Sequence, residues 1–582
     1  MRSRSEIGRL ASMALRLYGS RWHGIALGLL STFTGLAAAE LITGLVRDAS
    51  SPVLPVGQEV IDRVPIEVKN WAIDTFGTAD KAVLILGTIL SLAVIGSVVG
   101  ILAVRGARNA AYAVTVVVGL IGMYAVSMRP APTFGKMLPP IVGTLASIAV
   151  IWWLAPRLDG SSVSDTAQED AREPGPAAHT EPSATAVGRV GIDEPDASGE
   201  PDRPTRVELV PVAGSTRRGF LWGAGIVGVG AVVVGGLGRV LKRRFEVGEE
   251  RAALQLPEVD DTVPGSVPAS AGSDSMAAYD LGLEGVTPFV VPNGDFYRID
   301  TALAVPQVSK DGWSLRVHGM VERELELTFA DLLARPMIER PITLSCVSNR
   351  IGGDLVGNAV WQGVRMKDVL EEAGVDPEAT QVVSRSVDGW SCGSPTSVIM
   401  DGRDAMLAIA MNGEPLPPEH GYPVRLVVPG LYGYVSATKW VTEIEMTRWQ
   451  DFDGYWVPRG WAKEGPIKTM ARIDRPRNGR DLTPSTDGAV DIAGLAWAVH
   501  RGVSNVEVRL DDGEWRECEL AGVPSDDTWR QWRYRWESPT PGEHRVTARA
   551  YDGDGVPQPV GPKDVAPDGA EGYHSVRFTV DS

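Results

Sequence analysis

Residues 341–353 read Pro-Ile-Thr-Leu-Ser-Cys-Val-Ser-Asn-Arg-Ile-Gly-Gly, and the interpretation of the whole chain starts from them. Up to Ser345 the stretch is mostly apolar and predicts a strand, whereas the residues after Cys346 are typical of a turn and cannot continue it. The pattern therefore predicts a thiol held at the end of a rigid element. On its own, such a cysteine is also compatible with a small buried hydrophobic residue.

Residues 411–441 form a second segment, in which basic and hydroxyl side chains stand between glycines and prolines. It contains His420 and Arg425 within Glu-His-Gly-Tyr-Pro-Val-Arg and continues into Ser-Ala-Thr-Lys at 436–439. Together with residues 343–349, this segment resembles the molybdenum-binding core of the sulfite oxidase family. The resemblance covers about residues 287–475 well and extends more loosely to the C-terminus.

The resemblance implies a molybdenum–molybdopterin cofactor whose metal takes a single cysteine thiolate, here Cys346. Molybdenum that cycles between oxidation states needs soft donors, and thiolate is the softest protein ligand. Zinc or an iron–sulfur cluster would need several cysteines. Cys392 and Cys518 fall outside the matching motifs. We interpret both as structural, with Cys518 on a strand.

The resemblance also assigns the remaining site residues. Because the pterin carries a phosphate, several donors at fixed positions are needed to bind it. Alone, His420 would more simply be a hydrogen-bonded surface histidine. Arg350 is the implied catalytic arginine, and the implied cofactor-binding residues are Tyr297, Arg298, Cys346, Ser386, His420, Arg425, Ser436, Ala437, Thr438 and Lys439.

Two positions depart from the sulfite oxidases themselves. The family carries paired arginines after the cysteine loop, whereas here Ile351 follows Arg350. Trp461 stands where the family has its catalytic tyrosine, near Tyr455. The resemblance therefore implies a small oxyanion, or another molecule that donates or accepts an oxo group, without identifying it as sulfite. The electron-transfer partner and the direction of the reaction stay open.

Length and composition bound the remaining possibilities. A chain of 582 residues should form two or three domains, and a net charge of −17 argues against nucleic acid as a partner. With three cysteines, a disulfide framework is not expected. Of the seven histidines only His23 touches an apolar stretch, at its edge, which argues against a haem held by two histidines inside the membrane.

Five stretches are long and apolar enough to predict membrane spans: about 24–46, 82–104, 111–127, 138–155 and 219–241. Any one of them could instead be a buried helix of a soluble domain. Arginines precede the first, third and fifth stretches and predict a cytoplasmic N-terminus. Five spans then place everything after about residue 242 outside the cytoplasm, although Lys242, Arg243 and Arg244 oppose the usual charge bias.

The stretch from 158 to 216 is rich in Asp, Glu, Pro, Ser, Ala and Gly and predicts a disordered linker. It ends in Ser-Thr-Arg-Arg-Gly-Phe-Leu at 215–221, which resembles a twin-arginine export signal in an internal position. Arg217 and Arg218 could equally reflect the positive-inside bias alone. The export interpretation suits a protein that crosses the membrane after its cofactor has been inserted.

Beyond the linker, strands and helices alternate irregularly and predict an α+β domain that resembles the molybdopterin-binding domain of sulfite oxidases. We expect strands at 314–321 and 324–327, a helix that begins at Thr328 and another at 364–373. From about Thr483 short alternating strands predict an immunoglobulin-like sandwich. The resemblance implies that this last domain forms a homodimer.

The expected order of domains is a transmembrane helical domain with four spans (1–157), the linker (158–216), the twin-arginine-like signal with a fifth span (217–245), the oxidoreductase domain (246–480) and the dimerisation domain (481–582). The expected function is that of a multi-pass membrane protein with an extracytoplasmic molybdenum oxidoreductase. A membrane-tethered binding module that has the same fold but no metal is the alternative, followed by a transporter or assembly factor with a fused domain.

Overall fold

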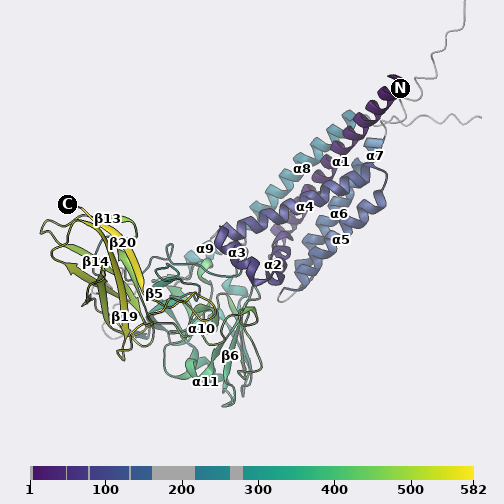
Figure 1. The fold of residues 1–582 in the computed structure, drawn as a ribbon. Coiled ribbons are helices and arrows are strands. Elements are labelled where there is room, and N and C mark those ends of the chain that lie inside the picture. Colours follow the sequence, from purple (N-terminus) through teal and green to yellow (C-terminus); the bar gives the residue numbers. More distant parts are fainter. Residues whose placement is uncertain are drawn as a thin grey trace, which may run out of the picture. The chain divides into compact units, whose positions relative to one another are not determined.

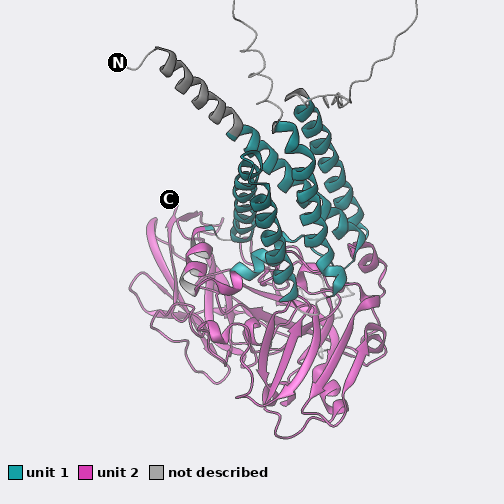
Figure 2. Ribbon diagram, turned by 90° about the vertical axis from the view of Figure 1, so that its right-hand side faces the viewer, with its two compact units in different colours: residues 1–60, 76–128, 132–244 teal, residues 61–75, 129–131, 245–582 magenta. Residues whose placement is uncertain are grey.

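The computed structural model describes residues 4–47, 49–76, 79–129, 133–159, 217–262 and 279–581. These residues form two compact units, shown in Figure 2. Unit 1 comprises residues 1–60, 76–128 and 132–244, and unit 2 comprises residues 61–75, 129–131 and 245–582. The predicted linker lies outside the described residues from 160 onward, as do Ser215 and Thr216 of the twin-arginine motif.

Unit 1 is helical (Figure 1). Five of its helical stretches are long and apolar enough to cross a membrane, and they overlap the five stretches expected from the sequence: Arg21–Leu45, Asp80–Val104, Arg108–Ser127, Phe134–Leu158 and Gly219–Ala253. The helices are α1 (Arg4–Leu45), α2 (Val53–Arg63), α4 (Asp80–Val104), α5 (Arg108–Ser127), α6 (Phe134–Leu154), α7 (Pro156–Asp159) and α8 (Arg217–Arg243).

Helix α1 contacts α4, α6 and α8 and is the common neighbour of these three helices. Its contact with α4 is close because glycines face each other. A Cβ added to Gly28 would lie 1.8 Å from the carbonyl oxygen of Gly96, and one added to Gly100 would lie 2.0 Å from that of Gly24. The contact of α1 with α8 is similarly tight at Gly238, where an added Cβ would lie 2.5 Å from the Glu40 carbonyl. Small residues permit such close backbone approach.

Unit 2 contains the remaining helices and every named strand. Its helices are α3 (Ile66–Phe76), α9 (Gly248–Ala253), α10 (Phe329–Leu333), α11 (Met366–Ala373) and α12 (Thr396–Met400), with single-turn 3₁₀ helices η4 (Lys310–Gly312), η5 (Pro418–His420), η6 (Gly433–Val435) and η7 (Val457–Arg459). The expected helix at Thr328 is confirmed, since Thr328 caps α10 through a capping box with Asp331. Helix α11 starts two residues later than expected because Val364 and Arg365 still belong to strand β5.

Two mixed sheets form the first part of unit 2. One has the order β1-β4-β5-β8-β10 with β9 beside β8, and the other has the order β3-β2-β11-β6-β7. The strands of the first sheet are β1 (Asp261–Thr262), β4 (Ile338–Ser345), β5 (Val356–Arg365), β8 (Met406–Met411), β9 (Glu414–Pro415) and β10 (Arg425–Val427). Those of the second are β2 (Ser314–Gly319), β3 (Leu325–Thr328), β6 (Gln381–Ser386), β7 (Ser391–Pro395) and β11 (Val441–Thr447).

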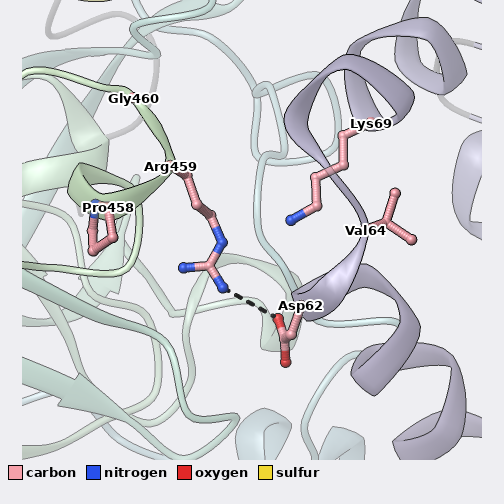
Figure 3. Close-up of a pocket in the computed structure, with 6 residues that line it drawn as sticks. All are labelled: Asp62, Val64, Lys69, Pro458, Arg459 and Gly460. Carbon is pink, nitrogen blue, oxygen red and sulfur yellow. Dashed lines mark ion pairs between the residues drawn. The ribbon is translucent and has the colours of Figure 1, made fainter.

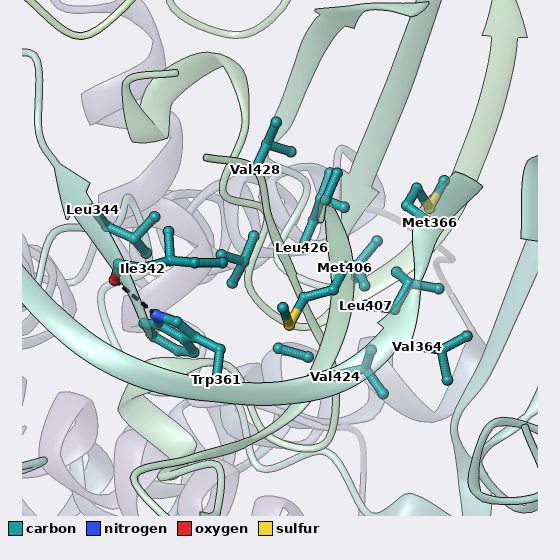
Figure 4. Packing of buried hydrophobic residues seen from close by; sticks show 14 of the residues in the cluster. Ile342, Leu344, Trp361, Val364, Met366, Met406, Leu407, Val424, Leu426 and Val428 are labelled. Carbon is teal, nitrogen blue, oxygen red and sulfur yellow. Dashed lines mark hydrogen bonds between the residues drawn. The ribbon is translucent and has the colours of Figure 1, made fainter. Parts of the chain in front are cut away.

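The first sheet positions the residues that the sequence singled out. Neighbouring strands from β4 to β10 are antiparallel, and Arg425 at the start of β10 pairs through Ala408 and Gly363 with the level of Ile338, at the start of β4. Cys346 follows the other end of β4, and the guanidinium of Arg425 lies against Trp361, which pairs with Arg340 of that strand. Buried side chains hold this sheet together, and Trp361 at its centre donates a 3.2 Å hydrogen bond to the Ile342 carbonyl (Figure 4).

The C-terminal region is built from strands, as expected. One sheet has the order β12-β14-β18-β17 and the other β13-β20-β19-β15-β16. Side chains from both sheets share one hydrophobic core. Cys518 lies between two short strands rather than on one. The strands are β12 (Met470–Arg475), β13 (Arg480–Leu482), β14 (Val490–Trp497), β15 (Val503–Leu510), β16 (Trp515–Glu517), β17 (Glu519–Leu520), β18 (Arg530–Trp536), β19 (Gly542–Asp552) and β20 (His574–Val580).

The glycine contact of α1 with α4 yields a first prediction. We expect Gly100→Leu to destabilise the helical unit by about 1–3 kcal/mol or more, because overpacking a tight contact forces the backbones apart. The matched control is Gly87→Leu on the same helix, where an added Cβ meets nothing within 4 Å. Thermal unfolding of the two full-length variants in detergent measures the difference, and equal melting temperatures would contradict the packing.

Candidate active site

Cys346 directly follows β4, where a tight loop leads into β5. Its amide donates a 2.9 Å hydrogen bond to the Leu355 carbonyl, so strand pairing extends to the cysteine. Asn349 closes the loop: its amide donates to the Cys346 carbonyl at 3.0 Å and its Oδ1 accepts from the Leu355 amide at 3.0 Å. The thiol is thus carried by a rigid element, as the sequence predicts.

The Cys346 side chain is only 9% exposed. This burial raises the pKa of the thiol, while a 3.4 Å hydrogen bond from the Ser348 amide to Sγ and the positive charge of Lys439 act in the opposite direction. A buried thiol of this kind is protonated unless a cation stabilises the thiolate. Bound metal would provide that cation.

Three basic side chains are buried in the neighbouring segment. His420, Arg425 and Lys439 are 2%, 4% and 9% exposed. Burial lowers the pKa of Arg425 to about 10 and that of Lys439 to about 8, and the charge of Arg425 contributes to the shift of Lys439. The three groups form one buried cluster, which we call the basic cluster, and within it the charges of Arg425 and Lys439 repel each other.

Little negative charge faces the basic cluster. Asp300 pairs with Lys439 at 3.1 Å and also with Arg298 at 2.8 Å, so one carboxylate serves two cations. Within the described part of the chain, Arg425 forms no ion pair with a carboxylate; it donates to the His420 carbonyl at 3.2 Å and its guanidinium lies 4.8 Å from the centre of the Trp361 ring. Such uncompensated burial of charge favours binding of an anion.

His420 presents an unused acceptor to this region. Its Nε2 lies 3.1 Å from the Asn293 carbonyl oxygen, which can only accept, so Nε2 carries the proton. Burial, followed by the charges of Lys439 and Arg425, lowers the pKa of His420 to about 3, and the ring is neutral. Its Nδ1 is therefore a buried acceptor, and it has no hydrogen-bond partner.

Arg425 presents the complementary donor, because its buried Nε also has no partner. The turn before β10 fixes this side chain. Gly421 adopts φ +113°, a conformation that L side chains rarely take, and a Cβ there would lie 2.9 Å from the Arg425 Cβ. The sequence signal for this turn is the Gly-Tyr-Pro that separates His420 from Val424.

Tyr297 lies near Cys346 and Arg425. It is half-buried and its ring stacks on Phe296 at 5.2 Å. Burial and the neighbouring Cys346 raise the pKa of its hydroxyl, whereas Arg425 lowers it. The hydroxyl therefore lies near both the cysteine and the basic cluster. Arg298 is exposed, and its charge also contributes to the lowered pKa of His420.

The other predicted residues take different positions. The hydroxyl of Ser436 donates to the Tyr432 carbonyl at 2.9 Å, and that of Thr438 lies 2.6 Å from the hydroxyl of Ser384, so both are used inside the protein. Ala437 donates its amide to the Gly433 carbonyl at 2.9 Å. Ser386 is buried at the end of β6 and accepts from the Asp388 amide at 3.4 Å. Arg350 is exposed on the loop that follows Cys346.

Sequence reasoning missed four participants. Asp300 is the counter-ion of Lys439, Trp361 lies against Arg425, and Asn293 fixes the tautomer of His420. The buried Nδ2 of Asn349 has no partner, close to the cysteine. Asp300 and Asn293 flank the predicted Tyr297 and Arg298, so their position in the sequence was a usable signal. Trp361 lies on a buried strand, and the sequence around it gave no signal of a role in the site.

Helix α9 is fixed to the segment that carries the basic cluster. Glu250 accepts hydrogen bonds from the Tyr422 hydroxyl at 2.7 Å, the Ser309 hydroxyl at 2.6 Å and the Lys310 amide at 2.7 Å. Arg251 pairs with Glu414 at 2.8 Å. Tyr422 stands between His420 and Arg425, so α9 restrains the turn that positions both.

Residues 302–456 match the family described as "Oxidoreductase molybdopterin binding domain". The chain is 39% identical over 153 residues to the uncharacterized oxidoreductase YuiH of Bacillus subtilis, over 26% of this chain and 74% of that protein. It is 30% identical over 360 residues to sulfite oxidase of Gallus gallus, over 52% of this chain and 76% of that protein.

Among solved structures, the sulfane dehydrogenase SoxCD of Paracoccus pantotrophus aligns with 26% identity and a TM-score of 0.40, over 54% of this chain and 82% of that chain. The chain spans 56% and 58% of the length of two mitochondrial sulfite oxidases that it also matches.

The basic cluster predicts a pH dependence of stability. The ammonium of Lys439 has a pKa of about 8 in the folded protein, against an ordinary value of 10.5. Between these two values the unfolded chain binds more protons than the folded protein, so the charged ammonium destabilises the folded state. This destabilisation is full below about pH 8 and fades as the pH rises. We therefore expect Lys439→Met to stabilise cofactor-free protein near neutral pH, with Arg298 still neutralising Asp300.

The stability difference between this variant and the unaltered protein should shrink above pH 8, by at most about 1.4 kcal/mol per pH unit. Thermal unfolding at a series of pH values measures it. Lys367→Met, at a side chain 39% exposed on α11, is the control and should show no such trend. A difference for Lys439→Met that stays constant from pH 7 to 10 would contradict the lowered pKa.

Proposed function

Because this chain belongs to the sulfite oxidase family of molybdopterin-dependent oxidoreductases, we propose that it catalyses two-electron oxo transfer at a molybdenum ligated by Cys346. The single observation that carries the proposal is the joint burial of this thiol with a basic cluster that lacks sufficient counter-charge. A structural cysteine would not need such surroundings.

The residues present fit the cofactor. The orphaned acceptor His420 Nδ1 suits an N–H of a pterin, and the orphaned donor Arg425 Nε suits a phosphate or carbonyl oxygen. Lys439 and Arg298 would add positive charge towards the phosphate. When bound, the cofactor supplies a centre that changes its oxidation state by two electrons. The protein's part is to hold it, to exclude water from Sγ and to keep His420 neutral.

We further propose that the enzyme acts on a small oxyanion or another oxo donor or acceptor, and that it exchanges electrons with a separate partner. Arg350, exposed beside Cys346, is the candidate for attracting an anionic substrate. The C-terminal region, with two sheets around one core, is the proposed immunoglobulin-like sandwich and homodimer contact.

The proposed location is a membrane, with the catalytic domain outside the cytoplasm. With five spans and a cytoplasmic N-terminus, the connections after the first and third spans lie on the same side as the residues after the fifth. Unit 2 collects residues 61–75, 129–131 and 245–582, which are parts of these three segments. This grouping supports an odd number of spans independently of the charge bias.

Cys346→Ser tests the catalytic proposal. We expect loss of oxo transfer from a folded protein, because a hard alkoxide replaces a soft donor. Metal and pterin content must be measured alongside, so that lost ligation is distinguished from lost cofactor. Cys392→Ser is the matched control and should retain both metal and activity. Unimpaired turnover by Cys346→Ser would remove this residue from the site, and purified protein without molybdenum would favour the binding-module alternative.

The location is tested with a reporter enzyme that is active only outside the cytoplasm. We expect activity when it is fused after residue 250 and none when it is fused near residue 190. Equal signals at both positions would contradict five spans. Replacing Arg217 and Arg218 with lysine keeps the charge bias, so blocked export of the variant would support the twin-arginine route, and normal export would support topology by charge alone.

A further inference from the structure

A pocket of about 550 Å³ lies within unit 2, between the segment that follows the first apolar helix and the 3₁₀ helix η7. Its lining, shown in Figure 3, consists of Asp62, Val64, Lys69, Pro458, Arg459 and Gly460. Two sequence-distant segments therefore supply the polar groups: residues 62–69 supply one cation and one carboxylate, and residues 458–460 supply the other cation.

The carboxylate of Asp62 is already engaged. Its Oδ1 accepts a 2.7 Å hydrogen bond from the Tyr455 hydroxyl, and its Oδ2 pairs with Arg129 at 3.0 Å. Arg459 reaches it only at 4.0 Å. Asp62 thus bonds directly to a hydroxyl and to a cation other than the two that line the pocket.

Lys69 and Arg459 leave an excess of positive charge at the pocket. Burial lowers the pKa of Lys69, and the nearby Arg459 charge lowers it further, so the two cations repel each other. Among the residues that line the pocket, the two cations face one carboxylate, Asp62, which also pairs with Arg129. Such an arrangement is stabilised when an anion bridges the cations.

Contacts with Tyr455 fix the position of Arg459. Its guanidinium lies 3.7 Å from the centre of the Tyr455 ring, and its Nη1 donates to the Tyr455 carbonyl at 2.5 Å. Tyr455 in turn donates its amide to the Ser391 carbonyl at 2.9 Å. This anchoring keeps Nη2 of Arg459 on the side of Asp62, at the pocket wall (Figure 3).

We propose that this pocket binds a small tetrahedral oxyanion, with Lys69 and Arg459 as donors and Asp62 as a carboxylate that offsets part of their charge. The site does not require the cofactor. It lies beside the segment that holds Trp461, whose ring is 6.3 Å from that of Trp456 and 6.0 Å from that of Tyr434. Tyr434 belongs to η6, which leads into Lys439 of the basic cluster. The pocket would therefore hold anions outside the candidate active site, since none of its lining residues belongs to that site.

The test uses inorganic sulfate as the probe and the full chain in detergent. An amine-acylating reagent labels lysines, and mass spectrometry follows the labelling rate of the peptide that contains Lys69. Sulfate is titrated with sodium chloride keeping the ionic strength constant. We expect sulfate to slow the labelling of Lys69, about tenfold at ten times its dissociation constant, and to leave the labelling of Lys367 on α11 unchanged.

Arg459→Gln should weaken the apparent affinity for sulfate by about tenfold or more, since it removes a charge-assisted hydrogen bond. Protection is compared as the ratio of rates with and without sulfate, because removal of Arg459 also changes the intrinsic reactivity of Lys69. Arg459→Lys, which keeps the positive charge but loses the paired N–H donors of the guanidinium, should show intermediate protection of Lys69. Unchanged labelling of Lys367 in each variant reports that the domain is folded.

Three results would overturn the proposal: no protection of Lys69 by sulfate, equal protection of Lys69 and Lys367, or full protection in Arg459→Gln. Because the readout is labelling rather than turnover, the experiment is independent of whether the protein carries molybdenum. Protection in protein that is free of cofactor would support the pocket even if the proposed oxo-transfer activity failed.

Discussion

Buried positive charge is the constraint on which the site depends. Arg425 and Lys439 lie in the interior, and Asp300 is the counter-ion that Lys439 shares with Arg298. Burial of the Arg425 and Lys439 charges lowers the stability of the folded protein. Such a cluster is stabilised when an anion compensates it. The sheet edge that carries Arg425, the turn at Gly421 and the contact with Trp361 all keep this charge in place.

The same constraint links the thiol to the cofactor. Cys346 follows β4 and Arg425 begins β10, two strands that are separated by β5 and β8, and Tyr297 interacts electrostatically with both residues. The thiol is buried and protonated without a cation, and the basic cluster is strained without an anion. The proposed binding, with the metal at Cys346 and the phosphate at the basic cluster, would satisfy both conditions at once.

The sequence predicted the parts of the molecule that depend on local pattern. The apolar stretches, the cap at Thr328 and the strand that leads to Cys346 could all be predicted from local pattern, whereas His420 and Arg425 were proposed from the family resemblance. Interactions between distant residues could not. Asp300 is recognised as a counter-ion only from its distance to Lys439, and the contact of the Thr438 hydroxyl with that of Ser384 likewise joins distant segments. Neither partnership follows from spacing along the chain.

The packing of α1 has a consequence for biosynthesis. This helix contacts α4 and α6, which follow it soon in the chain, and also α8, which is made only after the intervening residues 160–216. Until α8 is inserted, the close contact of Gly238 with the backbone of Glu40 and Leu41 is absent. The helical unit is therefore completed only when α8 joins it, and this is the same helix that precedes the catalytic domain.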